Sequence, residues 1–471
     1  MMTEIAQTFE FIFSEFANFM WGLPLVFLLV GGGLFFAIYS RLLPYRHFGH
    51  AINILRGKYD DPNDEGDIPH FQALSAALSG TLGLGNVAGV AVAISLGGPG
   101  AIFWMWVTAM VGVATKFYTC TLAVMYRGRD SQGHLQGGPM YVIREALGPR
   151  WKPLAMLFCV AGLFGTLPIF QVNQLVQLLR DTVGQNMGLV PAGEPWLFNL
   201  AVGLTVAVFV AVVILGDIQR IGRFAARIVP GMVLFYLAIT GYVLIVNSAA
   251  VPAAFTLIFT DAFSGEAAAS GVLVTVILMG VRRGVFSNEA GLGTEAMAHG
   301  AAKTNEPVRE GLVAMLGPMI DTLVVCTCTA LVILVTGAWH NPDVGGVTMT
   351  ALAFESAMPG FGQYALLFMV VLLSVSTIVT MWYYGAKCLG FLIGAEHQHH
   401  YIWIYVVLVL VGALVSLKTV IGLIDGMYAV MAIPTMLSTL ILAPKVNAAT
   451  RRYFQAKNAT ADSPVASELQ H

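Results

Sequence analysis

The sequence predicts an all-α protein that crosses a membrane many times. Of its 471 residues, 57% are hydrophobic and only 11% are charged, and the mean hydropathy is +0.76, a balance that soluble domains do not have. Apolar windows of about 20 residues, enough for a helix to cross the hydrocarbon core, recur along nearly the whole chain. Lys and Arg residues gather in alternate connections between these windows, as in polytopic helical membrane proteins.

The windows predict about eleven membrane-spanning helices. In chain order they cover roughly residues 17–42, 71–96, 100–126, 154–179, 197–216, 228–247, 268–290, 311–337, 361–393, 401–417 and 420–443. The first window is expected to be retained, because the residues before it include Glu4, Glu10 and Glu15 and no Lys or Arg, unlike a secretory signal.

The basic residues of the connections predict the orientation. If the N-terminus lies outside, one face collects most of them: Arg41, Arg46, Arg56, Lys58, Arg127, Arg129, Arg144, Arg150, Lys152, Arg220, Arg223, Arg227, Lys303, Arg309, Lys445, Arg451, Arg452 and Lys457. Arg180 and Lys418 fall on the opposite face. The positive-inside rule therefore predicts a multi-pass protein of the cell inner membrane with its N-terminus outside and its C-terminus in the cytoplasm.

Ten spans remain without the first, and two groups of five start on opposite sides of the membrane. This division predicts an inverted repeat, with the following parts: an extra helix and loop (1–70), a first repeat (71–250), a second repeat (251–445) and a cytoplasmic tail (446–471). The first helix of each repeat is rich in glycine, at residues 79–89 and 279–284. Paired interruptions of this kind are typical of transporters whose discontinuous helices line a site near the midplane. The alternative is that the glycines only allow close helix packing.

The first interruption has the chemistry to bind an amino-acid zwitterion. A zwitterion in the bilayer must keep both of its charges satisfied. The start of the second half-helix, near Gly85 and Asn86, offers N–H groups and a partial positive charge to a carboxylate.

The end of the first half-helix has the chemistry to bind a cation. Carbonyl groups near Ser79 and Leu82 are freed where the helix stops, and such carbonyls bind Na⁺ in transporters. Ser376 and Thr377, in the ninth span, are the hydroxyl side chains expected to complete this sodium site.

Two further polar positions lie in apolar surroundings, and each has two interpretations. Gln171 and Asn173, in the fourth span, contact either the substrate or a neighbouring helix. Asp321, in the eighth span, is either a proton relay or half of a structural ion pair.

Charged residues near the predicted inner end of the seventh span are candidates for a gate. Arg282, Arg283 and Glu289 could lie at the membrane boundary with their long side chains reaching the cytoplasmic surface, as a gate or as a packing network.

The sequence contains no signature of enzyme chemistry. It has no phosphate-binding loop, no H-E-x-x-H motif and no cysteine pair with zinc-site spacing, so no enzyme activity and no cofactor are expected. His397, His399 and His400 are interpreted as a polar loop rather than a metal site. The cysteines are expected to be small core residues: Cys120, Cys159, Cys326, Cys328 and Cys388.

Several motifs, in order, carry a family resemblance. They are Phe71-Gln72-Ala73-Leu74, Gly83-Leu84-Gly85-Asn86-Val87-Ala88-Gly89, Gly97-Gly98-Pro99-Gly100-Ala101, Phe103-Trp104-Met105-Trp106, Gly137-Gly138-Pro139-Met140-Tyr141, Arg283-Gly284-Val285-Phe286-Ser287-Asn288-Glu289-Ala290-Gly291-Leu292-Gly293, Ile320-Asp321-Thr322 and Cys326-Thr327-Cys328-Thr329-Ala330-Leu331. Together they resemble the alanine or glycine:cation symporter family, also called sodium:alanine symporters, of the amino acid-polyamine-organocation superfamily. The resemblance extends from about residue 20 to about residue 445.

The resemblance implies the leucine-transporter type of fold, a five-plus-five inverted repeat preceded here by one extra helix. It also implies uptake of alanine, glycine or a related small amino acid with Na⁺ as the coupling ion, and a few members of the family handle glutamine. By motif, Gly85 and Asn86 match the broken helix that holds the substrate, and Gln171 and Thr377 match residues of family motifs.

Three positions depart from the family pattern. Leu84 stands where a Thr is usual, Met381 where a Trp is usual, and Arg282 where a small residue is usual. A flexible Met reshapes a pocket more readily than a Trp. The expected substrate site comprises Gly85, Asn86, Leu84, Gln171, Gly280, Thr377 and Met381.

The function expected from the sequence is sodium-coupled symport of a small neutral amino acid by alternating access. The alternatives are a proton-coupled carrier with Asp321 as its relay, a glutamine-type substrate and, more remotely, a channel or receptor. The expected partners are the amino acid, Na⁺ and the bilayer, with no nucleic acid; the sequence does not predict an oligomeric state.

Overall fold

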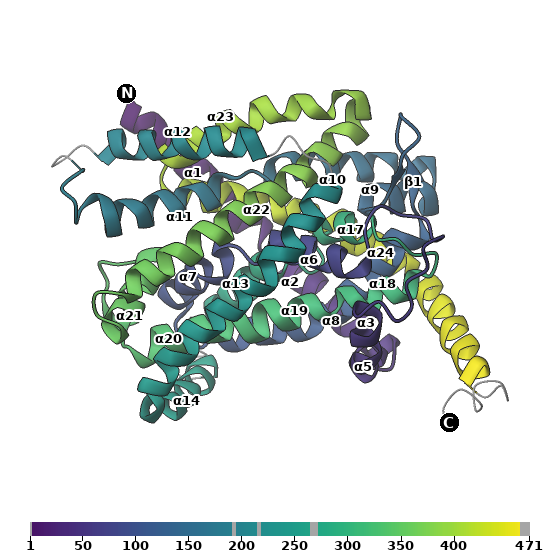
Figure 1. The fold of residues 1–471 in the computed structure, drawn as a ribbon, viewed down its shortest axis with the longest axis horizontal. Helices are drawn as coiled ribbons and strands as arrows, with labels where there is room; N and C mark the ends of the chain where they lie inside the picture. Colours follow the sequence, from purple (N-terminus) through teal and green to yellow (C-terminus); the bar gives the residue numbers. More distant parts are fainter. Residues whose placement is uncertain (1, 191–194, 214–217, 264–271, 462–471) are drawn as a thin grey trace.

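Long, tilted helices make up most of the protein (Figure 1). The computed structural model describes residues 2–190, 195–213, 218–263 and 272–461. Before residue 191 the helices are α1 (Met2–Met20), α2 (Leu23–Val26), η1 (Phe27–Gly31), α3 (Gly32–Tyr39), α4 (Leu43–Arg46), α5 (Phe48–Leu55), α6 (His70–Thr81), η2 (Leu84–Asn86), α7 (Ala88–Gly97), α8 (Ala101–Met125), α9 (Pro139–Val142), η3 (Ile143–Leu147), η4 (Pro149–Trp151), α10 (Lys152–Gly165), α11 (Ile169–Leu179) and η5 (Arg180–Gly184). A short antiparallel hairpin, β1 (Gly128–Arg129) and β2 (Leu135–Gln136), follows α8.

The rest of the described chain is helical as well. Its helices are α12 (Pro195–Val213), α13 (Ile218–Val246), η6 (Ser248–Ala250), α14 (Val251–Ala262), α16 (Val272–Asn288), α17 (Thr294–His299), α18 (Pro307–Ala314), α19 (Leu316–Pro318), η7 (Met319–Cys326), α20 (Thr327–Val335), η8 (Ala338–His340), α21 (Val347–Ala357), α22 (Gly362–Ile393), η9 (Ala395–His400), α23 (Tyr401–Leu414) and α24 (Leu417–Ala461).

The helix lengths agree with a polytopic membrane protein. Among the described residues, eight helices are long and apolar enough to cross a membrane, and two bent pairs raise this number to as many as ten. The seventh predicted span corresponds to α16, which has 17 residues. Positions 268–271 of that span and 214–216 of the fifth lie outside the described residues. Eleven spans therefore remain a prediction.

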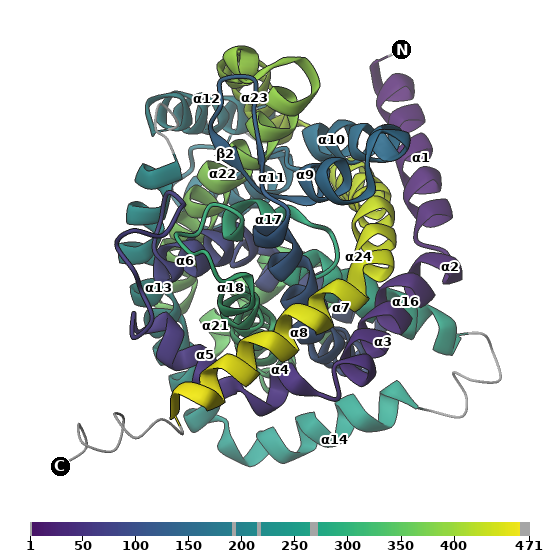
Figure 2. The ribbon, with the colours of Figure 1, turned by 90° about the vertical axis from the view of Figure 1, so that its right-hand side faces the viewer.

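Two predicted ends differ from the observed helices. The first helix begins at Met2 rather than near residue 17. The last, α24, continues to Ala461, past the predicted end near residue 443, although Pro434 and Pro444 lie inside it. Proline usually ends or kinks a helix, yet α24 continues through both positions. Figure 2 shows the second half of α24 crossing α8, α4 and α5.

The two interrupted helices lie among the other helices rather than at the edge. The half-helices α6 and α7 meet at an angle of 58°. Helix α6 packs against α13, α22 and α17, and α16 packs against α8 and α7. From Ala73 to Ile94 every side chain is buried, which explains why this segment reads as continuously apolar or small instead of amphipathic.

The second interruption lies later than the sequence predicted. Helix α16 is continuous through residues 279–284, and the chain leaves the helix only between Asn288 and Thr294. There Glu289, Gly291 and Gly293 have φ values of 56°, 88° and 93°. The prediction of an interruption at 279–284 is therefore wrong, and the glycines of that stretch allow close packing on α8, the alternative given above.

Candidate functional site

The first break exposes backbone groups in the middle of the bundle. Helix α6 stops at Thr81, Leu82 leaves helical geometry with ψ of 71°, and η2 leads into α7 at Ala88. Some backbone groups beside the break, among them the Ser79 carbonyl and the Leu84 N–H, are therefore bonded by side chains of other helices. Side chains of α22, α11 and η7 surround this break.

Helix α22 brings hydroxyl groups to the end of α6. Thr377 donates a hydrogen bond from Oγ1 to the Ser79 carbonyl oxygen at 3.0 Å. In return, Ser79 donates from Oγ to the Ser376 carbonyl oxygen at 3.0 Å. Thr380, which the sequence did not indicate, donates from Oγ1 to Ser79 Oγ at 3.0 Å. The four residues are buried and present neutral oxygens, a donor set that fits a hard monovalent cation.

The two other predicted members of the sodium site are placed differently. Leu82 is the residue at which α6 ends, next to Gly83. A side chain at Gly83 would approach Thr377 Oγ1 to 2.7 Å, so only glycine fits between the two helices. The Ser376 hydroxyl donates to the Leu373 carbonyl oxygen of its own helix at 3.0 Å, so it is the Ser376 carbonyl that contacts α6.

Gln171 reaches the break from α11. Its Oε1 atom accepts a hydrogen bond from the Leu84 N–H at 2.9 Å. The neighbouring amide has another role, because Asn173 donates to the carbonyl oxygens of Gly412 and Val415 at 3.2 and 2.8 Å. Of the two interpretations given for these amides, helix-to-helix contact therefore describes Asn173, whereas Gln171 contacts the unwound segment.

A fully buried carboxylate lies on the opposite side of η2. Asp321 accepts hydrogen bonds from the Asn86 amide, and from the hydroxyls of Ser287 and Thr322, both at 2.7 Å. Within the described ranges no basic side chain forms a salt bridge with Asp321, so the predicted structural ion pair is not present there. The sequence reasoning missed Ser287, although it lies at the end of α16 directly before the interruption.

Aromatic rings pack beside the break on the α16 side. A side chain at Gly85 would lie 3.2 Å from the Phe286 ring. Phe286 is in edge contact with Phe170, with ring centroids 4.9 Å apart, and lies 5.5 Å from the Tyr428 ring. These rings were not predicted, because isolated aromatic residues in a membrane helix give no distinguishing signal.

Two residues expected at the substrate site are not brought to the break by any contact among the described residues. Gly280 packs against α8, where an added Cβ would lie 2.5 Å from the Ala101 carbonyl oxygen and the Trp104 Cβ. Met381 is buried in α22, directly after Thr380.

The charged residues of α16 do not reach a membrane boundary. Arg282 and Arg283 are buried and both donate to Oδ2 of Asp425 in α24, Arg282 from Nε at 2.6 Å. Glu289 is buried too and accepts hydrogen bonds from the hydroxyls of Thr294 and Tyr428. The prediction that these side chains lie at the inner end of a span is wrong, because α16 ends in the protein interior. Asp425 could have been found from the sequence as an ionisable residue inside a predicted span.

A second buried charged cluster ties the start of α6 to α17 and α18. Glu310 accepts hydrogen bonds from Nδ1 of both His70 and His299, and all three side chains are buried. The backbones nearby pair as well: the Lys303 N–H donates to the Ile68 carbonyl oxygen at 2.7 Å.

The remaining polar clusters hold no site of their own. Among the residues that the structure describes, no group of three or more His, Cys, Asp or Glu side chains is placed to hold a metal ion, the cluster His397, His399 and His400 included. All five cysteines are free.

Membrane-length helices around the broken span of α6 and α7 define a polytopic membrane protein, and its fold is of the leucine-transporter type. The structure is similar to the crystal structure of MhsT in complex with L-phenylalanine, with a TM-score of 0.57 and 14% identity, covering 81% of this chain and 98% of that one. The sodium:alanine symporter family model matches residues 6–468, and the chain belongs to this family. It is a transporter and not an enzyme.

Two relatives show the range of the family. The chain is 39% identical over 454 residues to the sodium/alanine symporter AgcS of Methanococcus maripaludis, covering 94% of this chain and 98% of the relative. It is 30% identical over 461 residues to the probable sodium/glutamine symporter GlnT of Bacillus subtilis, covering 97% and 93%.

Proposed function

We propose that this protein couples the entry of a small neutral amino acid, alanine or glycine, to the entry of Na⁺. The observation that carries the proposal is the contact between the end of α6 and α22, where Thr377 Oγ1 lies 3.0 Å from the Ser79 carbonyl oxygen. A cation at this point joins the broken helix to α22 and so orders the segment that binds the substrate. Family membership and the relative named as a sodium/alanine symporter support the same function.

The proposed sodium ligands are oxygens of Ser79, Leu82, Ser376 and Thr377. The hydroxyl of Thr377 donates to the Ser79 carbonyl oxygen, and its own oxygen can turn toward an ion. One Na⁺ that enters down a membrane potential of 100 mV supplies roughly 2.3 kcal/mol, in addition to its concentration gradient.

The amino acid is proposed to lie beside the unwound segment, with Gly85, Asn86 and Leu84 on one side. The N–H groups and the positive end of the helix dipole at the start of α7 suit its carboxylate. Gln171 is the proposed partner from α11, and the Phe286 ring beside Gly85 limits the room available. Met381 is kept as a proposed wall of the site because it follows Thr380 in α22, and Gly280 is left out because it packs on α8.

Glutamine is the second candidate substrate. Leu84 and Met381 depart from the family pattern, and one relative carries the name of a probable sodium/glutamine symporter. A pocket wall of Met instead of a Trp can move to fit a longer side chain.

A proton is the second candidate for the coupling ion. The observation that favours it is the buried Asp321 carboxylate, which accepts three hydrogen bonds and has no salt bridge among the described residues. Such a group must be neutralised by a proton or a cation while it stays in the membrane interior.

The transport cycle is proposed to be alternating access in the cell inner membrane, with the N-terminus outside and the C-terminus in the cytoplasm. The repeats are proposed to be residues 71–250 and 251–445, after the extra helix at 1–70 and before the tail at 446–471. The distribution of Lys and Arg between the two faces supports this orientation.

Uptake into proteoliposomes tests the function. Labelled alanine, glycine and glutamine are offered under an inward sodium gradient, an inward proton gradient, or neither. We expect saturable uptake of alanine or glycine that requires the sodium gradient and that Asn86→Ala abolishes. If protons alone drive uptake and Asp321→Asn abolishes it, the coupling ion is a proton and not sodium. Conductance without saturable uptake would identify a channel instead.

A further inference from the structure

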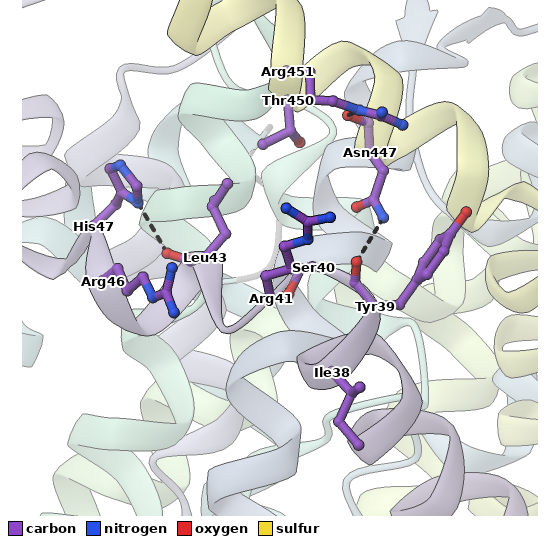
Figure 3. Close-up of a pocket in the computed structure, with 10 residues that line it drawn as sticks. All are labelled: Ile38, Tyr39, Ser40, Arg41, Leu43, Arg46, His47, Asn447, Thr450 and Arg451. Carbon is purple, nitrogen blue, oxygen red and sulfur yellow. Dashed lines mark hydrogen bonds between the residues drawn. The ribbon is translucent and has the colours of Figure 1, made fainter.

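A basic pocket lies where the first membrane helix ends and the long helix α24 passes. The cavity has a volume of about 610 Å³, and its wall comes from α3, α4 and the second half of α24. Figure 3 shows Arg41, Arg46 and Arg451 around it, with His47 and Asn447. Among the residues that the structure describes, no carboxylate lines this pocket.

The three arginines are not used to stabilise the fold through acidic partners. All three are exposed. Within the described part of the chain, none of them forms a salt bridge, and Arg451 donates only a long hydrogen bond, 3.4 Å from Nε to the Asn447 carbonyl oxygen. Three guanidinium groups around one cavity repel one another, so the cavity suits an anion that several of them can contact together.

The backbone holds this pocket in shape. Arg41 and Leu42 have φ values of 57° and 59°, a left-handed conformation that is strained for residues with a side chain. Asn447 fixes the corner to α24, because its Nδ2 donates to the Tyr39 carbonyl oxygen at 3.1 Å while Tyr118 donates to its Oδ1. The position of Arg41 therefore does not depend on the anion.

An apolar surface lies directly beside the arginines. Ile38 is 65% exposed, Leu42 48% and Phe48 44%. Exposed apolar side chains next to clustered arginines match a ligand that is anionic at one end and hydrocarbon at the other, which is the chemistry of a phospholipid. This face also carries most basic connections, and the cytoplasmic leaflet that such faces contact is the one rich in anionic lipid.

We propose that this pocket binds the phosphate of an anionic phospholipid. Arg41 and Arg451 contact the phosphate oxygens from opposite walls, Arg46 neutralises the remaining headgroup charge, and the acyl chains lie along Ile38 and Leu42. The bound lipid joins the first membrane helix to α24. Free phosphate shares the anionic chemistry but cannot use the apolar surface.

Lipid exchange on the purified, full-length protein tests this proposal. The delipidated protein in detergent is titrated with phosphatidylglycerol or phosphatidylcholine, and bound lipid is counted by native mass spectrometry. We expect a strong preference for phosphatidylglycerol that falls about 30-fold in the double variant Arg41→Gln plus Arg451→Gln, since each basic side chain contributes a factor of about five. Both residues are exposed, so we expect the double variant to fold, and its amino-acid uptake checks that it does.

A matched variant separates the pocket from general surface charge. Arg56→Gln plus Lys58→Gln also removes two positive charges, from exposed positions that do not line the cavity. This variant should keep the preference for phosphatidylglycerol. Equal losses in both double variants, or equal binding of the two lipids by the unchanged protein, would overturn the proposal. If inorganic phosphate binds as tightly as phosphatidylglycerol and displaces it, the site is one for free phosphate and the lipid assignment is wrong.

Discussion

Removing the Thr377 hydroxyl should lower the apparent affinity of the transporter for sodium without abolishing transport. Thr377→Val keeps the shape of a fully buried side chain and deletes the oxygen that lies 3.0 Å from the Ser79 carbonyl. A hydrogen bond or ligand contact to a charged group contributes about 1.5–3 kcal/mol. Since 1.4 kcal/mol is a factor of ten, the sodium concentration that gives half-maximal uptake should rise about 10- to 150-fold.

The assay is the initial rate of amino-acid uptake into proteoliposomes as external sodium is varied at constant ionic strength. Thr377→Ser keeps the hydroxyl and should stay within about threefold of the unchanged protein. Thr439→Val is the matched control, because that buried hydroxyl bonds to the Thr435 carbonyl oxygen in its own helix. The assignment of Thr377 to the ion site is refuted if Thr377→Val leaves the half-maximal sodium concentration unchanged. It is also refuted if Thr377→Ser raises that concentration as much as Thr377→Val does.

Three further predictions concern buried charge. Asp425→Asn leaves two buried arginines without their carboxylate and should destabilise the detergent-solubilised protein by about 3–5 kcal/mol in thermal unfolding, whereas Lys418→Gln, at an exposed position, should have no effect. Glu310→Ala removes two charge-assisted hydrogen bonds from histidines and should cost about 3 kcal/mol or more in the same assay. Burial, with the nearby Lys457 charge, lowers the pKa of His50 to about 4. The contribution of neutral His50 to the free energy of unfolding should therefore be present above pH 6.5 and lost as the pH falls toward 4. Hydrogen exchange at the end of α24 should show this loss of protection, and His50→Gln should remove it.

The fold class and several residues of the first interruption could be predicted from the sequence. Apolar windows and basic connections are properties of single segments, so they can be recognised along the chain without a partner. Ser79 was indicated by the predicted end of a half-helix, and Ser376 and Thr377 by their hydroxyl groups in an apolar span. The structure brings the three together at the end of α6. That they bind sodium remains a prediction.

The second interruption shows why other features could not be predicted. Residues 279–284 and 289–293 are both rich in glycine, and local sequence does not distinguish a glycine that breaks a helix from one that packs against another. Gly280 is closely covered by α8, whereas Gly291 and Gly293 adopt positive φ. Only the tertiary contacts of α8 decide between these roles, and they come from a segment about 180 residues earlier in the chain.

Buried charges on either side of the broken helices limit how the bundle can move. Asp425 joins α24 to α16 before its break, and Glu310 joins the start of α6 to α17 after that break. Each cluster lies in low-dielectric surroundings, where a charge separated from its partner is costly. In the proposed alternating access, we expect opening at one end of the bundle to separate one set of ionic interactions while the other set holds. A substrate and an ion that bind at the breaks lie between the two sets, where their binding energy can offset the cost of opening either one.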